Sequence, residues 1–286
     1  MTPRETSSGS PEVPAVSPHL IGVPAELWEK LRQSGRRLLL LDYDGTLAPF
    51  HVHRERAQVP PSTAKVLRSL AASPRTTVVV VSGRPIAEML VLLGDPELPV
   101  CLIGEHGWEE REPGGEIRFH PLSEEAQTGL EGAWKAIGAR GFQPRVEKKR
   151  SGLVLHTRGL FPDSDAAMQR AAEAVWLPWT ERAPLRLDNI SGGLELRASG
   201  RDKGMAAIDL HRRSGDVDLV VYVGDDETDE DAFRALRDLG FGIRVGHDER
   251  PTLAHGHLPK PEVMDEFLGR WLDADSIETP AAGRRE

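Results

Sequence analysis

Residues 38–46, LLLLDYDGT, place four leucines directly before two aspartates that are separated by one residue. A short run that is apolar at every position is typical of a central strand in a parallel sheet covered on both faces. Residues i and i+2 of an extended chain point to the same side, so we expect Asp42 and Asp44 to be neighbours. Gly45 lets the chain turn sharply after them. The stretch therefore predicts two carboxylates at one edge of a buried sheet.

Three more short apolar runs end in polar residues or glycine: TTVVVVSGR, PVCLIGEHG and DLVVYVGDD. Patterns with helical period lie at residues 62–74, 84–94 and 228–240, and they end at Pro74, Gly94 and Gly240. Strands that alternate with helices indicate an α/β fold with a doubly wound, Rossmann-like parallel sheet.

The pattern changes from about residue 114. A hairpin-like segment, GGEIRFHP, is followed by helix-like stretches at 123–141 and 163–176 and strand-like stretches at 151–159 and 184–199. This order predicts an inserted α+β cap domain at 114–196. The core would then comprise 24–113 and 197–272. Residues 1–23 and 273–286, whose composition resembles that of a Pro- and Ser-rich tail, are expected to be disordered.

Composition limits the class of protein. The chain has 286 residues and a formal net charge of −9, which disfavours a nucleic-acid partner. The one cysteine, Cys101, cannot form an internal disulfide and fits a reducing cytoplasm. No apolar run approaches the roughly 20 residues of a membrane span, and no signal peptide is evident. We expect a cytoplasmic protein with neither a nucleic-acid nor a membrane partner.

A second acidic cluster, GDDETDED, follows the strand-like run at 218–224 and contains Asp225, Asp226 and Asp229. Crowded carboxylates repel one another unless a cation lies between them, and a hard divalent ion prefers oxygen ligands. A helix N-terminus capped by Thr228 would account for the later acids, although not for Asp225 and Asp226. An EF-hand is excluded because the glycine after DYD occupies loop position four, not six, and His53 stands where a Glu ligand is needed.

The motifs DxDGT, SGR, a lysine before a helix, and GDD followed by Asp occur in that order from about residue 36 to 246. This ordered set resembles the haloacid dehalogenase superfamily of phosphotransferases. The resemblance implies a nucleophile at Asp42, a general acid and base at Asp44, and phosphate-holding groups at Ser82 and Lys203. It also implies Mg²⁺ held by Asp42, the backbone carbonyl of Asp44 and Asp225, with Asp226 and Asp229 in supporting positions.

Further stretches, among them GEHGWE, RVEKKRSGLVLHTR and GGLELRASGRDKGMA, resemble the trehalose-6-phosphate phosphatases. That resemblance implies sugar-binding roles for Glu147, Lys149 and Glu195. His106 would touch the substrate or hold its loop, and Arg84 would brace the loop after Ser82 or approach the phosphate. Two plainer alternatives are that residues 147–149 form a solvated charged run and that Glu195 points outward, paired with Arg197.

The expected function is hydrolysis of trehalose 6-phosphate by a Mg²⁺-dependent phosphatase that forms an aspartyl phosphate. Two alternatives remain open. One is the same chemistry on another sugar phosphate, such as a sucrose or glycosylglycerol phosphate, and the other is a non-catalytic phosphosugar sensor.

Overall fold

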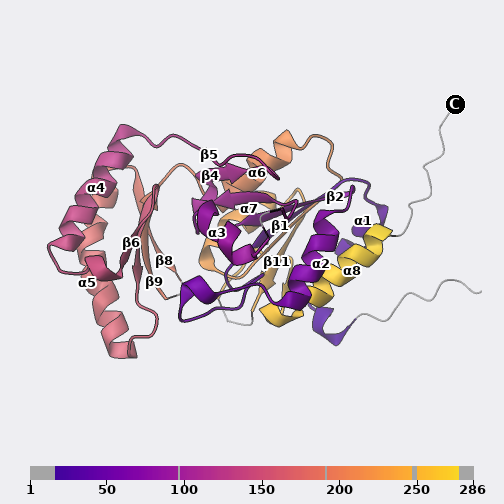
Figure 1. Ribbon diagram of the computed structural model, residues 1–286, viewed down its shortest axis with the longest axis horizontal. Helices are drawn as coiled ribbons and strands as arrows, with labels where there is room; N and C mark the ends of the chain where they lie inside the picture. The colour runs from indigo at the N-terminus through magenta and orange to yellow at the C-terminus, as the bar shows by residue number, and fades with distance from the viewer. Residues whose placement is uncertain (1–16, 96, 191, 247–249, 277–286) are drawn as a thin grey trace, which may run out of the picture.

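The computed structural model describes residues 17–95, 97–190, 192–246 and 250–276, and it divides into two sheet-based layers that lie side by side (Figure 1). The larger layer is built on an eight-stranded sheet with the order β12-β11-β10-β1-β2-β3-β4-β5. Its strands are β1 (Arg37–Asp42), β2 (Thr76–Val81), β3 (Cys101–Gly104), β4 (Glu109–Arg111), β5 (Arg118–Phe119), β10 (Leu219–Gly224), β11 (Phe241–Val245) and β12 (Gly256–Leu258).

The sheet is parallel from β12 to β3, and the order reverses around β1, which lies between β2 and β10. Beyond β3, β4 pairs antiparallel with β3 and β5 pairs antiparallel with β4. The prediction of a doubly wound α/β core is therefore confirmed, with its switch point at the strand that carries Asp42.

Helices cover both faces of the large sheet. On one face are α1 (Ala25–Gln33), α2 (Pro61–Ala71), α3 (Ile86–Leu93) and α8 (Met264–Ser276), and on the other are α6 (Lys203–Arg213) and α7 (Glu230–Leu236). Successive leucines of β1 alternate between the two clusters, with Leu39 and Leu41 in the first and Leu38 and Leu40 in the second. Because both faces are buried, the strand is apolar at every position, as residues 38–41 predict.

The smaller layer is a four-stranded antiparallel sheet with the order β6-β7-β9-β8. It consists of β6 (Val146–Lys148), β7 (Gly152–His156), β8 (Leu185–Ile190) and β9 (Gly193–Ala198), and it is covered on one face by α4 (Glu124–Gly138) and α5 (Pro162–Arg182). Both helices lie on the outer side of this sheet in Figure 1. The other face of this sheet faces the large layer.

The boundaries differ from the expected ones in three places: at the start of the insertion and in both terminal segments. The hairpin-like segment at 114–121 contributes β5 to the large sheet, because Arg118 and Phe119 pair with Glu110 and Glu109 of β4. Residues 17–23 are ordered, because Leu20 and Val23 are buried in the core cluster despite the Pro- and Ser-rich composition around them. Residues 273–276, also expected to be disordered, form the end of α8. The disorder expected for 1–16 and 277–286 concerns positions outside the described residues.

Three-residue 3-10 turns complete the chain. They are η1 (Pro18–Leu20), η2 (Arg54–Arg56), η3 (Glu105–Gly107), η4 (Gln143–Arg145), η5 (Glu227–Asp229) and η6 (Pro261–Val263). Two of them, η2 and η3, follow strands of the large sheet and face the smaller layer. None of the helices in the described part of the chain is both long and apolar enough to cross a bilayer.

Candidate active site

Three neighbouring strands end at the same edge of the large sheet, and each delivers a polar side chain there. Asp42 is the last residue of β1, Ser82 follows β2, and Asp225 follows β10. Since β1 lies between β2 and β10, these residues meet at the switch point, where ligands of open α/β sheets bind.

A compact acidic cluster surrounds Lys203 at the start of α6. Carboxylate oxygens of Asp42, Asp225 and Asp229 lie within 4.8 Å of one another. Lys203 Nζ donates to Asp42 Oδ1 at 2.7 Å and to Asp229 Oδ1 at 2.7 Å. Burial would lower the pKa of Lys203, but Asp229 and Asp42 outweigh it and raise that pKa. This lysine therefore stays charged and links the two carboxylates.

Burial has the opposite effect on the acids. It raises the pKa of Asp42 to about 8, although Lys203 opposes the shift. It also raises the pKa of Asp225 well above its usual value, and the nearby charge of Asp42 adds to the effect. Carboxylates in this state favour a cation between them.

Asp229 is already saturated as an acceptor. Its Oδ1 also accepts from the Tyr222 hydroxyl at 2.6 Å, and its Oδ2 accepts from the backbone N–H groups of Asp225 at 3.0 Å and Asp226 at 2.9 Å. With four donors on two oxygens, Asp229 shapes the loop after β10 and positions Lys203. It has no lone pair to spare for a metal ion.

Asp225 is the reverse case, because its buried Oδ1 has no hydrogen-bond partner among the described residues. Gly45 packs against this carboxylate: its φ is +81°, and a Cβ there would lie 2.3 Å from Asp225 Oδ2. The loop after β1 can therefore approach the loop after β10 only with glycine at position 45. Asp42 and Asp225 thus offer hard oxygen donors with an unmet acceptor, which fits Mg²⁺.

Asp226 caps η5, and Asp229 completes a capping box with it. The expectation that Thr228 is the cap is wrong, because Thr228 lies inside the turn. The carboxylate of Asp226 accepts from the backbone of η5, and the carboxylate of Asp229 accepts from the backbone N–H of Asp226.

Asp44 is bound by Arg84. The guanidinium reaches both carboxylate oxygens, with Nε at 2.6 Å from Oδ2 and Nη2 at 2.7 Å from Oδ1. Arg84 also pairs with Glu88. Burial lowers the pKa of Arg84, but hydrogen bonds and charge from Asp44 outweigh it and raise that pKa. The Ser82 hydroxyl accepts from the backbone N–H of Arg84 at 3.1 Å, so this serine braces the same loop.

The free face of the small sheet carries charged residues in one row. Glu147 pairs with Val154, Val154 with Glu195, and Glu195 with Asp188 across the four strands. Paired residues of neighbouring strands point to the same face, so these side chains face the large layer. Lys148 points the other way and pairs with Glu131 of α4.

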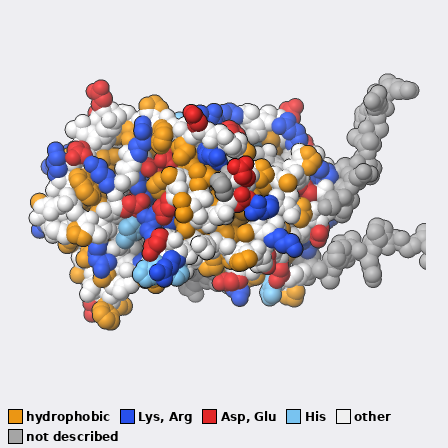
Figure 2. Space-filling view, in the orientation of Figure 1, with side chains coloured by type: hydrophobic (Ala, Val, Ile, Leu, Met, Phe, Trp, Pro, Cys, Tyr) orange, Lys and Arg blue, Asp and Glu red, His pale blue; other side chains and the backbone are white. Residues whose placement is uncertain are grey.

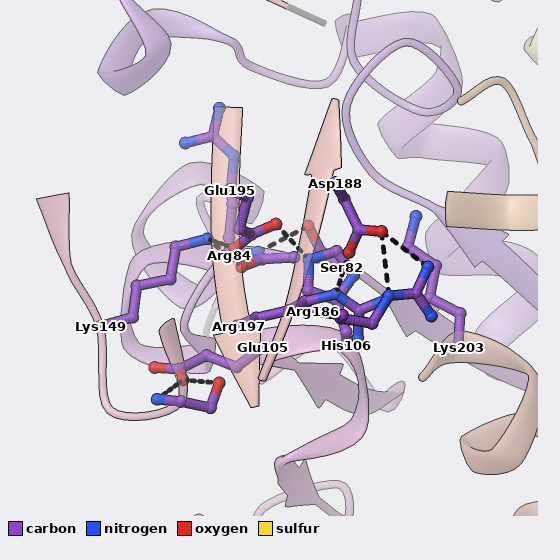
Figure 3. A network of polar contacts seen from close by, with 12 residues as sticks. Ser82, Arg84, Glu105, His106, Lys149, Arg186, Asp188, Glu195, Arg197 and Lys203 are labelled. Atoms are coloured by element: carbon purple, nitrogen blue, oxygen red, sulfur yellow. Dashed lines mark hydrogen bonds and ion pairs between the residues drawn. The ribbon is translucent and has the colours of Figure 1, made fainter. Parts of the chain in front are cut away.

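Glu195 lies at the centre of this face and is 2% exposed. It accepts from Lys149 Nζ at 2.9 Å and from His106 Nε2 at 2.9 Å, as Figure 3 shows. Burial raises its pKa, but Lys149 and His106 outweigh that effect and hold the pKa well below its usual value. The alternative of an outward Glu195 paired with Arg197 is wrong, because Arg197 pairs with Asp188 at 2.7 Å.

Core residues contact the charged row from the opposite side. Lys149 Nζ donates to the backbone carbonyl of Gly83 at 2.8 Å. Gly83 must lack a side chain here, since a Cβ would lie 2.6 Å from His106 Nε2. Glu147 accepts from His156 at 2.9 Å and from Arg54, a residue of η2.

Sequence reasoning gave no role to Arg54 or Glu88, which pair with each other and extend the network from Arg84 to Glu147. Two signals could have identified them. The basic stretch HRER follows the carboxyl end of β1, and Glu88 lies one helical turn beyond Arg84.

The two layers enclose a cavity of about 320 Å³, within the range of small-molecule sites. Figure 2 shows charged and histidine side chains gathered where the layers meet. Lining residues from the sequence-based prediction are Asp42, Asp44, Ser82, Arg84, His106, Glu147, Lys149, Glu195, Lys203 and Asp226. Asp229 lies behind this wall and is fully buried.

Comparison with known proteins gives one family. Residues 40–261 match the family model described as trehalose-phosphatase. The chain is 32% identical to a probable trehalose-phosphate phosphatase C of Arabidopsis thaliana, over 82% of this chain and 76% of that protein. It is 34% identical to a bifunctional trehalose-6-phosphate synthase/phosphatase of Thermoproteus tenax, over 77% of this chain and 29% of that protein. The chain spans less than a third of each of the first four curated relatives.

Among solved structures, the C-terminal domain of a Candida albicans trehalose-6-phosphate phosphatase matches with a TM-score of 0.76 and 23% identity, covering 87% of this chain and 96% of that one. A haloacid dehalogenase-like hydrolase of Bacillus subtilis matches with a TM-score of 0.53 and 16% identity, over 82% of this chain and 97% of that one. These likenesses support the fold assignment.

Proposed function

The chain belongs to the trehalose-phosphatase family, and from this premise we propose that it hydrolyses trehalose 6-phosphate to trehalose and phosphate. One observation carries the proposal. A single cavity joins the acidic edge of the core to the charged row of the small sheet, so phosphate chemistry and sugar recognition can act on one bound molecule.

In the proposed reaction, the Asp42 carboxylate attacks phosphorus and the bond between phosphorus and the sugar oxygen breaks, which leaves an aspartyl phosphate. Asp44 gives its proton to the leaving alkoxide. It then takes a proton from water as that water attacks the intermediate, so Asp42 and phosphate are released and both acids return to their initial states. Lys203 lies 2.7 Å from Asp42 and holds charge beside the reacting carboxylate.

We propose Mg²⁺ as the cofactor, held by Asp42, Asp225 and the backbone carbonyl of Asp44. When bound, it supplies positive charge that neutralises the phosphoryl oxygens. The unpartnered Asp225 Oδ1 and the raised pKa of Asp42 support this assignment. Asp229 would act through Lys203 and the loop after β10, in agreement with its four hydrogen bonds.

We propose that the smaller layer, which runs from α4 (Glu124–Gly138) to β9 (Gly193–Ala198), acts as the cap and that Glu147, Lys149 and Glu195 bind sugar hydroxyls. A disaccharide offers many groups that both donate and accept. A smaller sugar would leave some of these buried charges unpaired, and unpaired buried polar groups are the strongest source of discrimination. A cytoplasmic location is part of the same proposal, because the chain has one cysteine and no disulfide to protect.

Steady-state phosphate release with Mg²⁺ across a panel of sugar phosphates tests the proposal. Trehalose 6-phosphate should give the highest kcat/KM, by at least about tenfold over sucrose, glycosylglycerol and glucose phosphates. Equal turnover of all esters would assign the chain to a general sugar phosphatase, and binding without turnover would assign it to a sensor. Asp42→Asn should abolish release without changing the circular dichroism spectrum.

A further inference from the structure

Glu105 of η3 joins the core to the small sheet, although it is not among the residues expected in the site. Its side chain is buried, and its carboxylate accepts from the backbone N–H groups of Ser151 at 2.7 Å and Arg150 at 3.2 Å, and also from the Ser151 hydroxyl. All three donors belong to the turn between β6 and β7. A single core carboxylate therefore holds the end of a hairpin in the other layer.

The turn that Glu105 holds carries Lys149. The backbone N–H of Lys149 donates to the carbonyl of Gly152 at 2.8 Å, which closes the turn. From there the ammonium group reaches Glu195 and the carbonyl of Gly83. The position of Lys149 in the cavity depends on where the turn lies, and Glu105 fixes that position from the core side. Figure 3 labels Glu105 and Lys149 within one network of polar contacts.

The backbone at Glu105 is unusual. Its φ is +45°, and that of the next residue, His106, is +56°. Left-handed conformations are unfavourable for residues other than glycine, asparagine and aspartate, and they persist where the surroundings hold them in place. Here the backbone N–H groups of Glu105 and His106 donate to the carbonyls of Arg84 and Ser82, each at 3.0 Å. This conformation aims the carboxylate at the turn and the imidazole at Glu195.

We propose that Glu105 is a positioning residue for the sugar site: it anchors the turn at residues 149–152 on the core and thereby sets Lys149 and Glu195 for the substrate. The inference rests on the proposed function. Glu105 does not line the cavity, so it acts through the turn and not on the substrate.

The test uses the full chain with Glu105→Gln, which keeps the size and removes the charge, and Glu105→Gly, which removes the side chain and tolerates the left-handed backbone. Glu116→Gln, a change at an exposed acid of the neighbouring loop, is the matched control. Both Glu105 variants should raise KM for trehalose 6-phosphate about tenfold, the loss expected for charge-assisted hydrogen bonds. Their kcat with p-nitrophenyl phosphate should change less than about threefold, because that ester has no sugar to position.

Amide hydrogen exchange of the peptide containing Ser151 gives a readout independent of substrate. Exchange should be at least about tenfold faster in Glu105→Gly than in the wild type and unchanged in the control. If the wild type releases no phosphate from trehalose 6-phosphate, the proposed function fails, and slow exchange in Glu105→Gly would then overturn the anchor as well. If the wild type is active, an unchanged KM in both Glu105 variants overturns the positioning role.

Discussion

Arg84 forms a bidentate ion pair with Asp44, in which Nε lies 2.6 Å from Oδ2 and Nη2 lies 2.7 Å from Oδ1. Such a two-point pair fixes the plane of the carboxylate as well as its place. Arg84 is 4% exposed, and Glu88 holds it from the other side. The proposed proton donor is therefore oriented by a guanidinium that is itself held in position.

Arg84→Gln should lower kcat for trehalose 6-phosphate about 100-fold, in the range found for losing general acid catalysis. An alkoxide needs a proton to leave, whereas p-nitrophenolate does not. The same variant should therefore lose much less activity with p-nitrophenyl phosphate. Parallel steady-state assays of the two esters measure the difference. Equal losses on both would mean that Arg84 serves the phosphoryl site instead of Asp44.

The crowded acids predict how metal binding and stability are linked. Adding Mg²⁺ at 100 times its Kd should stabilise the fold by about 2.7 kcal/mol, because the ion binds the folded chain alone. This stabilisation should appear as an increase in Tm, and Asp225→Asn should abolish the increase. The substitution should also raise the Tm without metal, because it removes a buried carboxylate whose charge is disfavoured by burial and by the nearby charge of Asp42.

Asp226→Asn is the control for that experiment. Asparagine caps helices as well as aspartate does, so the cap of η5 is kept. The Mg²⁺ shift should persist in this variant. Loss of the shift in Asp226→Asn with its retention in Asp225→Asn would move the metal site to the other acid.

The strands of the core and the acids at their ends could be predicted because the sequence signals that produce them are local. Residues 38–41 are apolar at every position since both faces of β1 are covered, and this signal needs no knowledge of the partners. Carboxyl ends of parallel strands share an edge, so Asp42 and Asp225 could be placed together from topology alone.

The contacts between the layers could not be predicted in this way. Arg54 is 93 residues from Glu147, and Glu105 is 46 residues from Ser151. Arg54, Glu105 and Ser151 lie in turns, and Glu147 lies in the three-residue strand β6. These segments have no hydrophobic period, so nothing in the sequence links the partners. Leu20 and Val23 show the same limit, since composition described their neighbours and not their own burial.

Strand alternation separates Glu147 from Lys148 and predicts opposite outcomes for neighbouring changes. Glu147 faces the cavity and Lys148 faces α4. Glu147→Gln should lower kcat/KM for trehalose 6-phosphate about tenfold relative to p-nitrophenyl phosphate, because a charged acceptor for sugar hydroxyls is lost. Lys148→Gln should leave that ratio unchanged. Ratios that respond equally to both changes would contradict the assignment of the cavity face.

His156 predicts a pH dependence of stability. Burial, with the positive charges of Arg54 and Lys149, lowers the pKa of His156 to about 4, while an unfolded histidine titrates near 6.5. Between these values the unfolded chain binds a proton that the folded chain does not, so the free energy of unfolding should fall as the pH drops from about 6.5 to 4. Urea unfolding of wild type and His156→Gln at pH 7, 6 and 5 measures the slope, which should be smaller in the variant. Because the side chain is 35% exposed, the difference should be well under the full value for one proton. An imidazole signal that disappears in His156→Gln and titrates near pH 6.5 in the folded wild type would contradict this account.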